Sequence, residues 1–202
     1  GGATFPTHVK ISGGIGKVDH VLINGAECEP YITGDHRAML ERPEEIIGGC
    51  KYLAKMFGVD KVIIGVEDNK QNGIDMMNKV IAEQNAPVVV EPLHCRYPQG
   101  GEKQLIDAVM GRQVKSMGLP IDVGAVVQNV ATSLAVYEAV QKNMPLVTNV
   151  MTITGDCLPM EKQHNYKFRI GMPLSYIAEY AGGVPEEAAK IISGGPMMGK
   201  AI

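Results

Sequence analysis

Four segments of the chain have the short apolar pattern of a buried strand, and each is followed by a turn or by polar residues. They cover residues 18–24 (VDHVLIN), 61–67 (KVIIGVE), 88–93 (VVVEPL) and 124–130 (GAVVQNV). The first run ends in Asn24-Gly25, which is a turn signal. We therefore predict four buried strands.

Helical patterns separate these strands. Pro43 is expected to start a helix that Gly58 ends, and Asp35 is expected to cap a short helix that runs to Leu40. Residues 102–110 and the segment from Thr132 to Lys142 are predicted as two more helices. The apolar residues that recur at helical spacing between the first three strands are Ile46, Ile47, Cys50, Leu53, Ala54 and Phe57, and then Ile74, Met77 and Ile81. Strands and helices in this alternation predict an α/β fold, a Rossmann-like parallel sheet with right-handed crossover helices.

From Leu146 onward the pattern changes. Residues 146–156 and 166–170 are predicted as strands, residues 173–181 as a small helix, and residues 190–195 as a last strand. These elements are typical of a small α+β unit resembling a β-grasp. We place a boundary near Pro145, between an α/β domain (1–145) and a β-grasp domain (146–202).

Composition and charge exclude several classes of function. The formal net charge is -3, and the Lys and Arg residues are scattered, so neither nucleic acid nor an anionic membrane surface is a favoured partner. No apolar run reaches the ~18 residues that span a bilayer, and no signal peptide is present, so we expect a soluble chain without direct membrane insertion. The four cysteines form no CxxC pair, which favours structural thiols in a reducing compartment over a metal site.

Three strand ends carry polar residues: Asn24 to Glu29, Tyr97 to Glu102, and Gln128 to Thr132. In open α/β sheets, ligands bind in the crevice beyond the carboxyl ends of the strands, so we expect the three segments to converge there. Gly100-Gly101 opens a helix, which suits an anion or carbonyl site and equally a tight turn without a ligand.

The chain starts with GGATFPTHVK. Its glycine pair has two interpretations: a backbone that approaches a phosphate, or a flexible tail. Phe5-Pro6-Thr7 argues against a mere tail, because an aromatic residue, a fixed φ and a helix-capping residue follow one another.

Four of these segments, read together, resemble a known family. GGATFPTHVK, INGAECEPYITGDHR, YPQGGEKQL and VVQNVATS, in this order, resemble the flavin-binding domain shared by the C subunit of the Rnf electron transport complex (RnfC) and the NADH-oxidising subunit of respiratory complex I. The closing segments ITGD, FRIGMPLSYIAEYAGG and SGGPMMG are similar to the soluble-ligand-binding β-grasp (SLBB) domain of those proteins, and GGPMMG points to the RnfC family. The resemblance covers essentially the whole chain.

The resemblance implies an enzyme module that takes hydride from NADH onto FMN and passes single electrons, reversibly, to iron–sulfur clusters. It implies that Glu102 is catalytic and faces NADH together with Phe5 and Glu29. The residues implied to contact FMN are Gly1, Gly2, Lys10, Asn24, Glu27, Tyr97, Gly100, Asn129 and Thr132. Taken singly, Lys10 is typical of a solvated charge, Phe5 of a core residue, and Asn129 with Thr132 of a helix cap.

The resemblance also implies a peripheral subunit at the cytoplasmic face of the cell membrane, with the other Rnf subunits as partners and ferredoxin as an indirect one. Relatives carry 4Fe-4S cluster motifs that these residues lack, so we expect a fragment of a longer protein whose clusters lie elsewhere. Ala26, Gly101 and Ala131 stand where the complex I pattern has acidic residues. Two alternatives stay open: a cobalamin reductase of the same family, and a non-catalytic scaffold that docks partner subunits.

Overall fold

The computed structural model describes residues 5–202, and the chain forms two compact units. The first unit contains the residues up to Cys28 and then Asp35–Pro145. The second contains Leu146–Ile202 and also the short segment Glu29–Gly34. The apolar pattern did not indicate that this segment, which follows the first strand, belongs with the C-terminal part of the chain.

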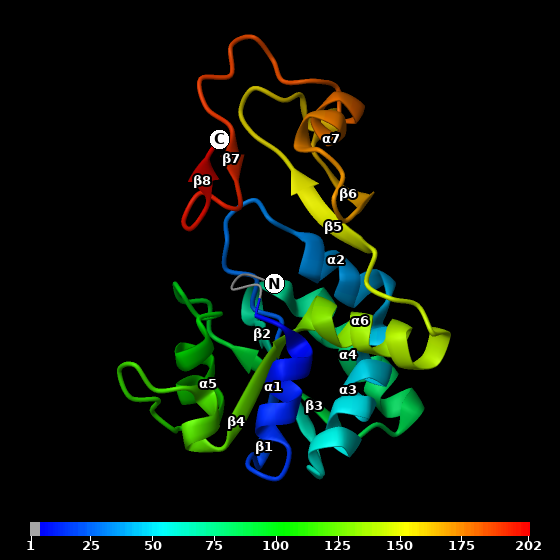
Figure 1. Cartoon of the computed structure of the whole chain (residues 1–202), viewed down its shortest axis with the longest axis vertical. Helices are drawn as coiled ribbons and strands as arrows, with labels where there is room; N and C mark the ends of the chain where they lie inside the picture. Colours follow the sequence, from blue (N-terminus) through cyan, green and yellow to red (C-terminus); the bar gives the residue numbers. More distant parts are fainter. Residues whose placement is uncertain (1–4) are drawn as a thin grey trace. The chain divides into compact units, whose positions relative to one another are not determined.

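A four-stranded parallel sheet forms the centre of the first unit (Figure 1). Its strands are β1 (His20–Asn24), β2 (Val62–Glu67), β3 (Val88–Leu93) and β4 (Ala125–Asn129), in the order β3-β2-β1-β4. The chain moves outward from β1 to β3 and then returns to the other side of β1. The predicted parallel α/β sheet is confirmed, and its strand order reverses between β1 and β4.

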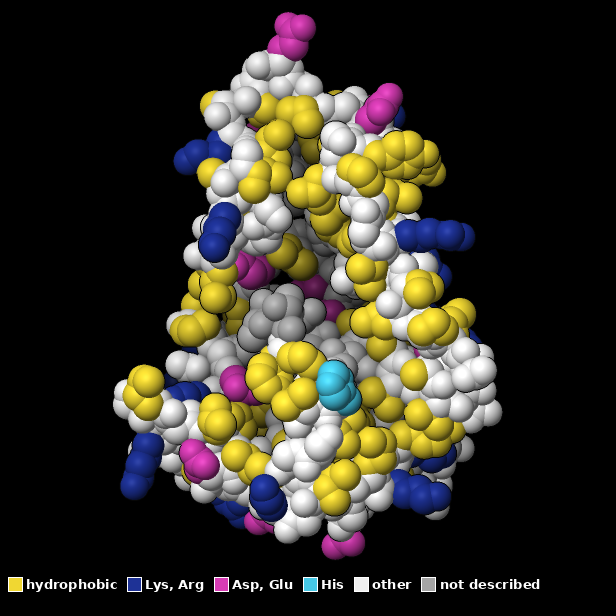
Figure 2. Space-filling model, viewed as in Figure 1, with side chains coloured by type: hydrophobic (Ala, Val, Ile, Leu, Met, Phe, Trp, Pro, Cys, Tyr) yellow, Lys and Arg dark blue, Asp and Glu magenta, His cyan; other side chains and the backbone are white. Residues whose placement is uncertain are grey.

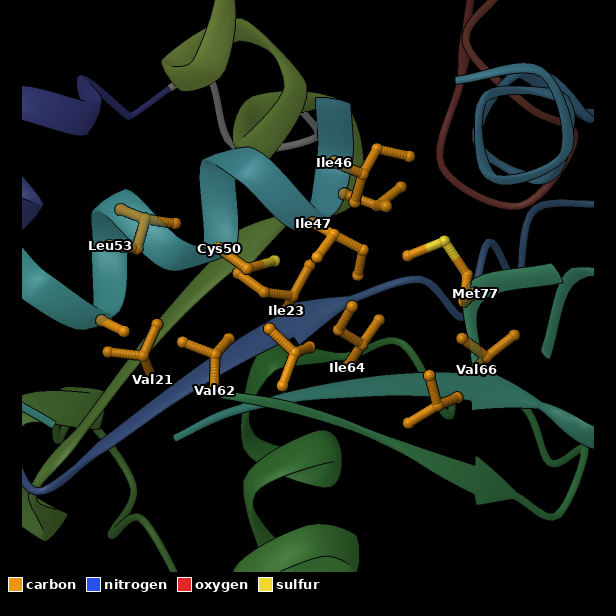
Figure 3. Close-up of a cluster of buried hydrophobic side chains, with 14 of the residues drawn as sticks. Val21, Ile23, Ile46, Ile47, Cys50, Leu53, Val62, Ile64, Val66 and Met77 are labelled. Atoms are coloured by element: carbon orange, nitrogen blue, oxygen red, sulfur yellow. The ribbon is translucent and has the colours of Figure 1, made fainter. Parts of the chain in front are cut away.

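Helices cover both faces of this sheet. On one face, the helix α3 (Pro43–Phe57) buries its apolar stripe against β1 and β2, as Figure 3 shows for Ile47 and Cys50 above Ile23 and Val62. The helix α4 (Gln71–Gln84) adds Met77 to the same cluster. On the other face, α5 (Glu102–Met110) packs Leu105 and Ile106 against Leu22. The bounds of α3 and α5 are those predicted.

The helix α6 (Val130–Lys142) crosses α3 at very short range. A Cβ atom added at Gly49 of α3 would lie 1.9 Å from the backbone oxygen of Ser133. Ser133 is fully buried, so the two helix backbones approach each other without intervening side chains. Only glycine fits at this point of the crossing.

Two shorter helices precede this region. The helix α2 (Gly34–Glu41) corresponds to the one predicted after Asp35, and α1 (Thr7–Gly14) was not predicted as a helix. Its sequence THVKISGG has no apolar stripe and ends in two glycines. Tertiary packing holds it, because Gly14 lies against Phe57 and Val126. Pro6, rather than Thr7, is its N-cap residue, so the expected cap at Thr7 is wrong.

Residues 5–202 also contain three short 3-10 helices: η1 (Asp68–Lys70), η2 (Pro120–Val123) and η3 (Met160–Lys162). In the second unit, β5 (Thr148–Ile153) pairs antiparallel with β6 (His164–Arg169), and α7 (Leu174–Tyr180) follows. The predicted last strand is shorter than expected: β7 (Ile192–Ser193) has two residues and pairs with β8 (Lys200–Ala201), which was not predicted.

The surface agrees with the charge pattern of the sequence. Lys and Arg side chains lie dispersed over the face shown in Figure 2. Among residues 5–202, no helix is both long and apolar enough to cross a membrane. The cysteines are all free thiols, and Cys50 lies on the buried face of α3, in the core.

Candidate functional site

The ends of β1 and β4 meet at the point where the strand order reverses. Asn24 and Asn129 are partners in the register of these two strands, at the last residue of each. The Asn24 amide donates a hydrogen bond to the Gly100 carbonyl oxygen at 2.7 Å, and its own oxygen accepts one from the Ala26 N–H at 3.2 Å. The predicted convergence of polar strand ends is therefore confirmed for these segments. It lies at the topological switch point, where open α/β sheets bind ligands.

Lys10 reaches this edge from α1. Its Nζ atom lies 2.9 Å from Glu102 Oε1 and donates a second hydrogen bond to the Val127 carbonyl oxygen, also at 2.9 Å. The side chains of Lys10 and Glu102 are 29% and 39% exposed. The interpretation of Lys10 as a solvated charge is thus wrong, because it is a partly buried cation held beside the end of β4.

Glu27 and Asp35 form a pair of carboxyl groups beside the same edge. Glu27 has a positive φ of 53°, and its carboxylate accepts hydrogen bonds from the N–H groups of Asp35 (2.6 Å) and His36 (3.0 Å). Glu27 therefore caps α2, and the prediction that Asp35 is the cap is wrong. Burial, and then the charge of Asp35, raise the pKa of Glu27 from 4.5 to about 7. Burial also raises the pKa of Asp35.

Asn129 links this acid pair to α6. Its side-chain oxygen accepts a hydrogen bond from the Ala131 N–H at 2.8 Å, and its amide donates one to Asp35 Oδ2 at 2.6 Å. The helix-cap interpretation of Asn129 is confirmed. Thr132 lies in the first turn of α6, and the leading N–H groups of a helix have no partner within the helix. The positive end of the α6 dipole thus faces the edge at which the strands end.

Gly100 is packed tightly against the loop that follows β1, residues 25–28, called the β1 loop below. A Cβ atom at this position would lie 3.0 Å from Cys28 Sγ and 3.2 Å from the Ala26 Cβ atom. The Gly100 N–H donates to Cys28 Sγ at 2.8 Å. Burial raises the pKa of the Cys28 thiol, so the group at this contact is a neutral thiol. The contact between the two loops is itself a reason for glycine at position 100.

Phe5 and Tyr97 are exposed aromatic side chains of the first unit. Phe5 is 55% exposed and Tyr97 is 60% exposed. The interpretation of Phe5 as a core residue is therefore wrong. An open depression of about 300 Å³ lies along α5, and among the described residues Tyr97 is the only predicted site residue that lines it. The hydrogen-bonded strand ends are the stronger candidate for a site, because polar groups from several elements converge there.

Glu29 belongs to the second unit. Its carboxylate oxygens accept hydrogen bonds from the N–H groups of Met198 (2.8 Å) and Met197 (3.1 Å). It therefore fixes the turn before β8, and its assignment to NADH stays a prediction. Gly1 and Gly2 lie outside the described residues.

Glu67 and Lys70 were not among the predicted site residues. The Glu67 side chain is 2% exposed and that of Lys70 is 11% exposed, and they form an ion pair of 2.9 Å at the end of β2. The signal was present, since Glu67 ends the strand KVIIGVE as Asn24 and Asn129 end theirs. The polar end of β2 could therefore have been predicted as part of the site in the same way.

Residues 1–138 match the family of the Nuo51 FMN-binding domain. The chain belongs to this family. Residues 150–201 match the SLBB domain, so the predicted combination of a parallel-sheet flavin-family domain and an SLBB-type domain is confirmed.

Curated relatives support the same relationship. The chain is 48% identical over 200 residues to the C subunit of a proton-translocating ferredoxin:NAD(+) oxidoreductase complex from Clostridium ljungdahlii, and the match covers 98% of this chain and 43% of that protein. It is 46% identical to the C subunit of the Na(+)-translocating complex from Acetobacterium woodii, with 98% and 44% covered. The predicted resemblance to the RnfC family is confirmed. The chain spans less than half the length of these relatives.

Solved structures give the fold. An NAD+-reducing [NiFe]-hydrogenase in its H2-reduced state matches with a TM-score of 0.79 and 21% identity over 94% of this chain and 38% of that chain. Its air-oxidised state matches with a TM-score of 0.74 and 21% identity over 88% and 35%. At this identity the match shows a shared architecture.

The residues at the switch point fit the flavin of this family. Gln128, on β4 next to Asn129, has a buried Nε2 atom without a hydrogen-bond partner among the described residues. Orphaned buried donors are rare in native proteins, and a ligand acceptor is one way to satisfy them. Lys10 is a cation at this edge. In the first turn of α6 the Ala131 N–H is bonded to Asn129, and the other leading N–H groups have no partner within the helix, which suits a phosphate. An amide-rich edge that includes the Lys10 cation suits the polar ring atoms and the phosphate of FMN.

Proposed function

We propose that this chain is the FMN- and NADH-binding part of the C subunit of an Rnf-type ion-translocating ferredoxin:NAD oxidoreductase. Bound FMN supplies the chemistry that accepts a hydride from NADH and passes electrons on singly, to 4Fe-4S clusters outside these residues. The flow is reversible. The observation that carries the proposal is the meeting of Asn24, Gly100, Lys10, Glu102 and Asn129 at the β1/β4 switch point of a chain in this family.

The residues of the edge have separate tasks in this proposal. Lys10 and the first turn of α6, with Asn129 and Thr132, hold the phosphate end, because a cation and unpaired N–H groups stabilise an anion. Asn24 and Glu27 face the flavin ring, with the backbone of Gly100 and the ring of Tyr97. Gly1 and Gly2 are assigned to the phosphate and ribityl chain.

The nicotinamide side is assigned to Phe5, Glu29 and Glu102. The exposed ring of Phe5 offers an apolar surface on which a nicotinamide stacks. Glu102 begins α5 and lies beside Lys10, so its carboxylate stays oriented by an ion pair. We assign it to the NADH face as the catalytic residue that orients the dinucleotide for transfer.

The partners and the location follow from the relatives. The matching subunits of the relatives are named as parts of multi-subunit complexes, and we propose that this chain likewise works with other Rnf subunits and reaches ferredoxin indirectly. We place it at the cytoplasmic face of the cell membrane as a peripheral subunit.

Anaerobic absorption spectroscopy tests the proposal. The intact natural protein that carries this chain, loaded with FMN, is expected to lose its flavin absorbance when NADH is added. Titration with FMN is expected to quench flavin fluorescence, and Lys10→Met is expected to weaken that binding about tenfold, since hydrogen bonds to charged groups contribute roughly 1.5–3 kcal/mol. Lys79→Met is the matched control, because Lys79 is exposed on α4. An intact protein that neither quenches FMN fluorescence nor bleaches with NADH would favour the scaffold alternative.

A further inference from the structure

A buried ion pair at the end of β2 has no task in the function proposed above. Lys70 Nζ lies 2.9 Å from Glu67 Oε2, and the two side chains are 11% and 2% exposed. Other Lys–Glu pairs of the first unit are far more open, such as Lys79–Glu83 on α4 at 66% and 58%. The Glu67–Lys70 pair therefore carries a desolvation cost that the surface pairs avoid.

The pair is bonded to the β1 loop. Lys70 Nζ donates a hydrogen bond to the Ala26 carbonyl oxygen at 2.8 Å. The Cys28 thiol donates to Glu67 Oε1, with a sulfur–oxygen distance of 3.4 Å. Two residues of the loop that follows Asn24 are thus held by two charged groups at the end of the neighbouring strand.

The same network continues to the loop before α5. Cys28 Sγ accepts the Gly100 N–H at 2.8 Å, and Gly100 in turn accepts a hydrogen bond from Asn24. Residues from three loops are therefore connected in one chain of contacts, from Lys70 and Glu67 through Cys28 to Gly100. The β1 loop lies in the middle of this network: Glu67 and Lys70 contact it from one side of the chain of contacts, and Gly100 from the other.

Burial of an ion pair is weak evidence of a gain in stability, because well-packed apolar residues often stabilise as much. A hydrogen-bonded network of this kind instead selects one geometry among several. We propose that Glu67 and Lys70 are positioning residues, which fix the Ala26–Cys28 loop and the backbone of Gly100 in the arrangement that the flavin site requires. This inference rests on the proposed function, since these loops are the ones assigned to the flavin ring.

Three variants of the intact protein test the inference. Lys70→Met leaves a buried carboxylate unpaired and is expected to lower both the melting temperature and the affinity for FMN. In the double variant Glu67→Met with Lys70→Met, both charges are gone, so the melting temperature is expected to return close to that of the wild type. Its dissociation constant for FMN is expected to stay raised about tenfold. Loss of residues that orient a binding group has effects of this size in metal sites. Lys79→Met is the surface control for both readouts.

Recovery of FMN affinity together with the melting temperature in the double variant would overturn the inference, since the pair would then be structural only. Lys70→Arg adds a second criterion. A guanidinium keeps the charge and the donors, so it is expected to restore FMN binding to within about threefold of the wild type, and a loss equal to that of Lys70→Met would contradict a positioning role.

Amide hydrogen exchange in the flavin-free protein separates this inference from the proposed function. The Gly100 N–H is bonded to Cys28 Sγ, so Lys70→Met and the double variant are expected to exchange it about tenfold faster than Lys79→Met does. If the wild-type protein did not bind FMN, the proposed function would fail while this measurement still reported on the network. Unchanged exchange at Gly100 in both variants would refute the positioning role even in a protein that binds FMN.

Discussion

Lys10 and Glu102 are 92 residues apart in the sequence and 2.9 Å apart in the structure. Lys10 comes from α1 and Glu102 is the first residue of α5, while the same Lys10 ammonium also bonds the backbone of β4 at Val127. One cation therefore ties together three elements at the switch point. Because Lys10 and Glu102 form an ion pair, substitutions at the two positions are coupled and their effects need not add.

Glu102→Gln is expected to separate flavin binding from reaction with NADH. The amide keeps the shape of the side chain and an oxygen for Lys10, so the FMN content of the intact protein should stay near that of the wild type. Loss of the negative charge on the proposed NADH face should slow NADH-driven flavin bleaching about tenfold, which corresponds to roughly 1.4 kcal/mol. Stopped-flow absorbance under anaerobic conditions gives the rate, and the bound flavin released on denaturation gives the content.

Asp107→Asn is the control for this variant, because Asp107 is an exposed carboxylate on the same helix. It should change neither quantity. Equal losses of FMN content and of bleaching rate in Glu102→Gln would mean that Glu102 supports the structure of the site and takes no part in NADH recognition.

Glu27 should make the stability of the first unit depend on pH. Its pKa is raised from 4.5 to about 7, so between these values the folded state binds more protons than the unfolded state. The free energy of unfolding therefore falls as the pH rises from about 4.5 to 7 and levels off above that, with a total change on the order of 3 kcal/mol. Urea unfolding at a series of pH values measures this slope.

Glu27→Gln is expected to flatten the slope, because the amide does not titrate. A smaller slope of the same sign should remain, since burial also raises the pKa of Asp35. Glu44→Gln, an exposed glutamate in the first turn of α3, should leave the slope as it is. A Glu27→Gln protein with the full wild-type slope would show that Glu27 is not the group that titrates.

Gly49→Ala is expected to destabilise the first unit strongly. The new Cβ atom would lie 1.9 Å from the Ser133 backbone oxygen, and the backbone cannot rotate away as a side chain can. Overpacking with a backbone shift costs about 1–3 kcal/mol, and we expect the upper end of this range. Gly13→Ala is the matched control, because nothing lies within 4 Å of its Cβ position in α1, and there alanine should stabilise by about 0.5–1 kcal/mol. Equal effects of the two substitutions on urea unfolding would refute the close crossing.

The strongly periodic parts of the fold could be predicted from the sequence. The bounds of α3 and α5 agree with the prediction because each has a regular apolar stripe and a clear end, with Gly58 and Gly111 in the left-handed conformation that glycine adopts at helix ends. The helix α1 lacks such a stripe, and its packing through Gly14 is a tertiary effect. A two-residue strand such as β8 carries no periodic signal at all.

The site divides in the same way. Asn24 and Asn129 could be found because each ends an apolar run, and the rule that ligands gather at the carboxyl edge of a sheet then brings them together. The pairing of Lys10 with Glu102 could not be found, because it depends on where α1 crosses β4. The assignment of Glu29–Gly34 to the second unit could not be predicted either. It depends on hydrogen bonds between residues far apart in sequence, such as that from the Thr33 N–H to Thr152 Oγ1.

The contacts of Glu29 within the second unit and its proposed role in NADH binding can be measured separately. Its carboxylate accepts the N–H groups of Met197 and Met198, so Glu29→Ala should leave two donors unpaired and loosen the turn before β8. Faster amide exchange at Met198 in the NADH-free protein is the expected result, with Glu161→Ala, an exposed residue of η3, as the control. Glu29→Gln retains one acceptor and should restore part of the protection, because a single oxygen still bonds one of the two N–H groups. If Glu29→Ala left Met198 exchange unchanged and raised the concentration of NADH needed for half-maximal bleaching, Glu29 would act on the dinucleotide alone. Faster exchange with an unchanged NADH dependence would instead show that the role of Glu29 is limited to the second unit.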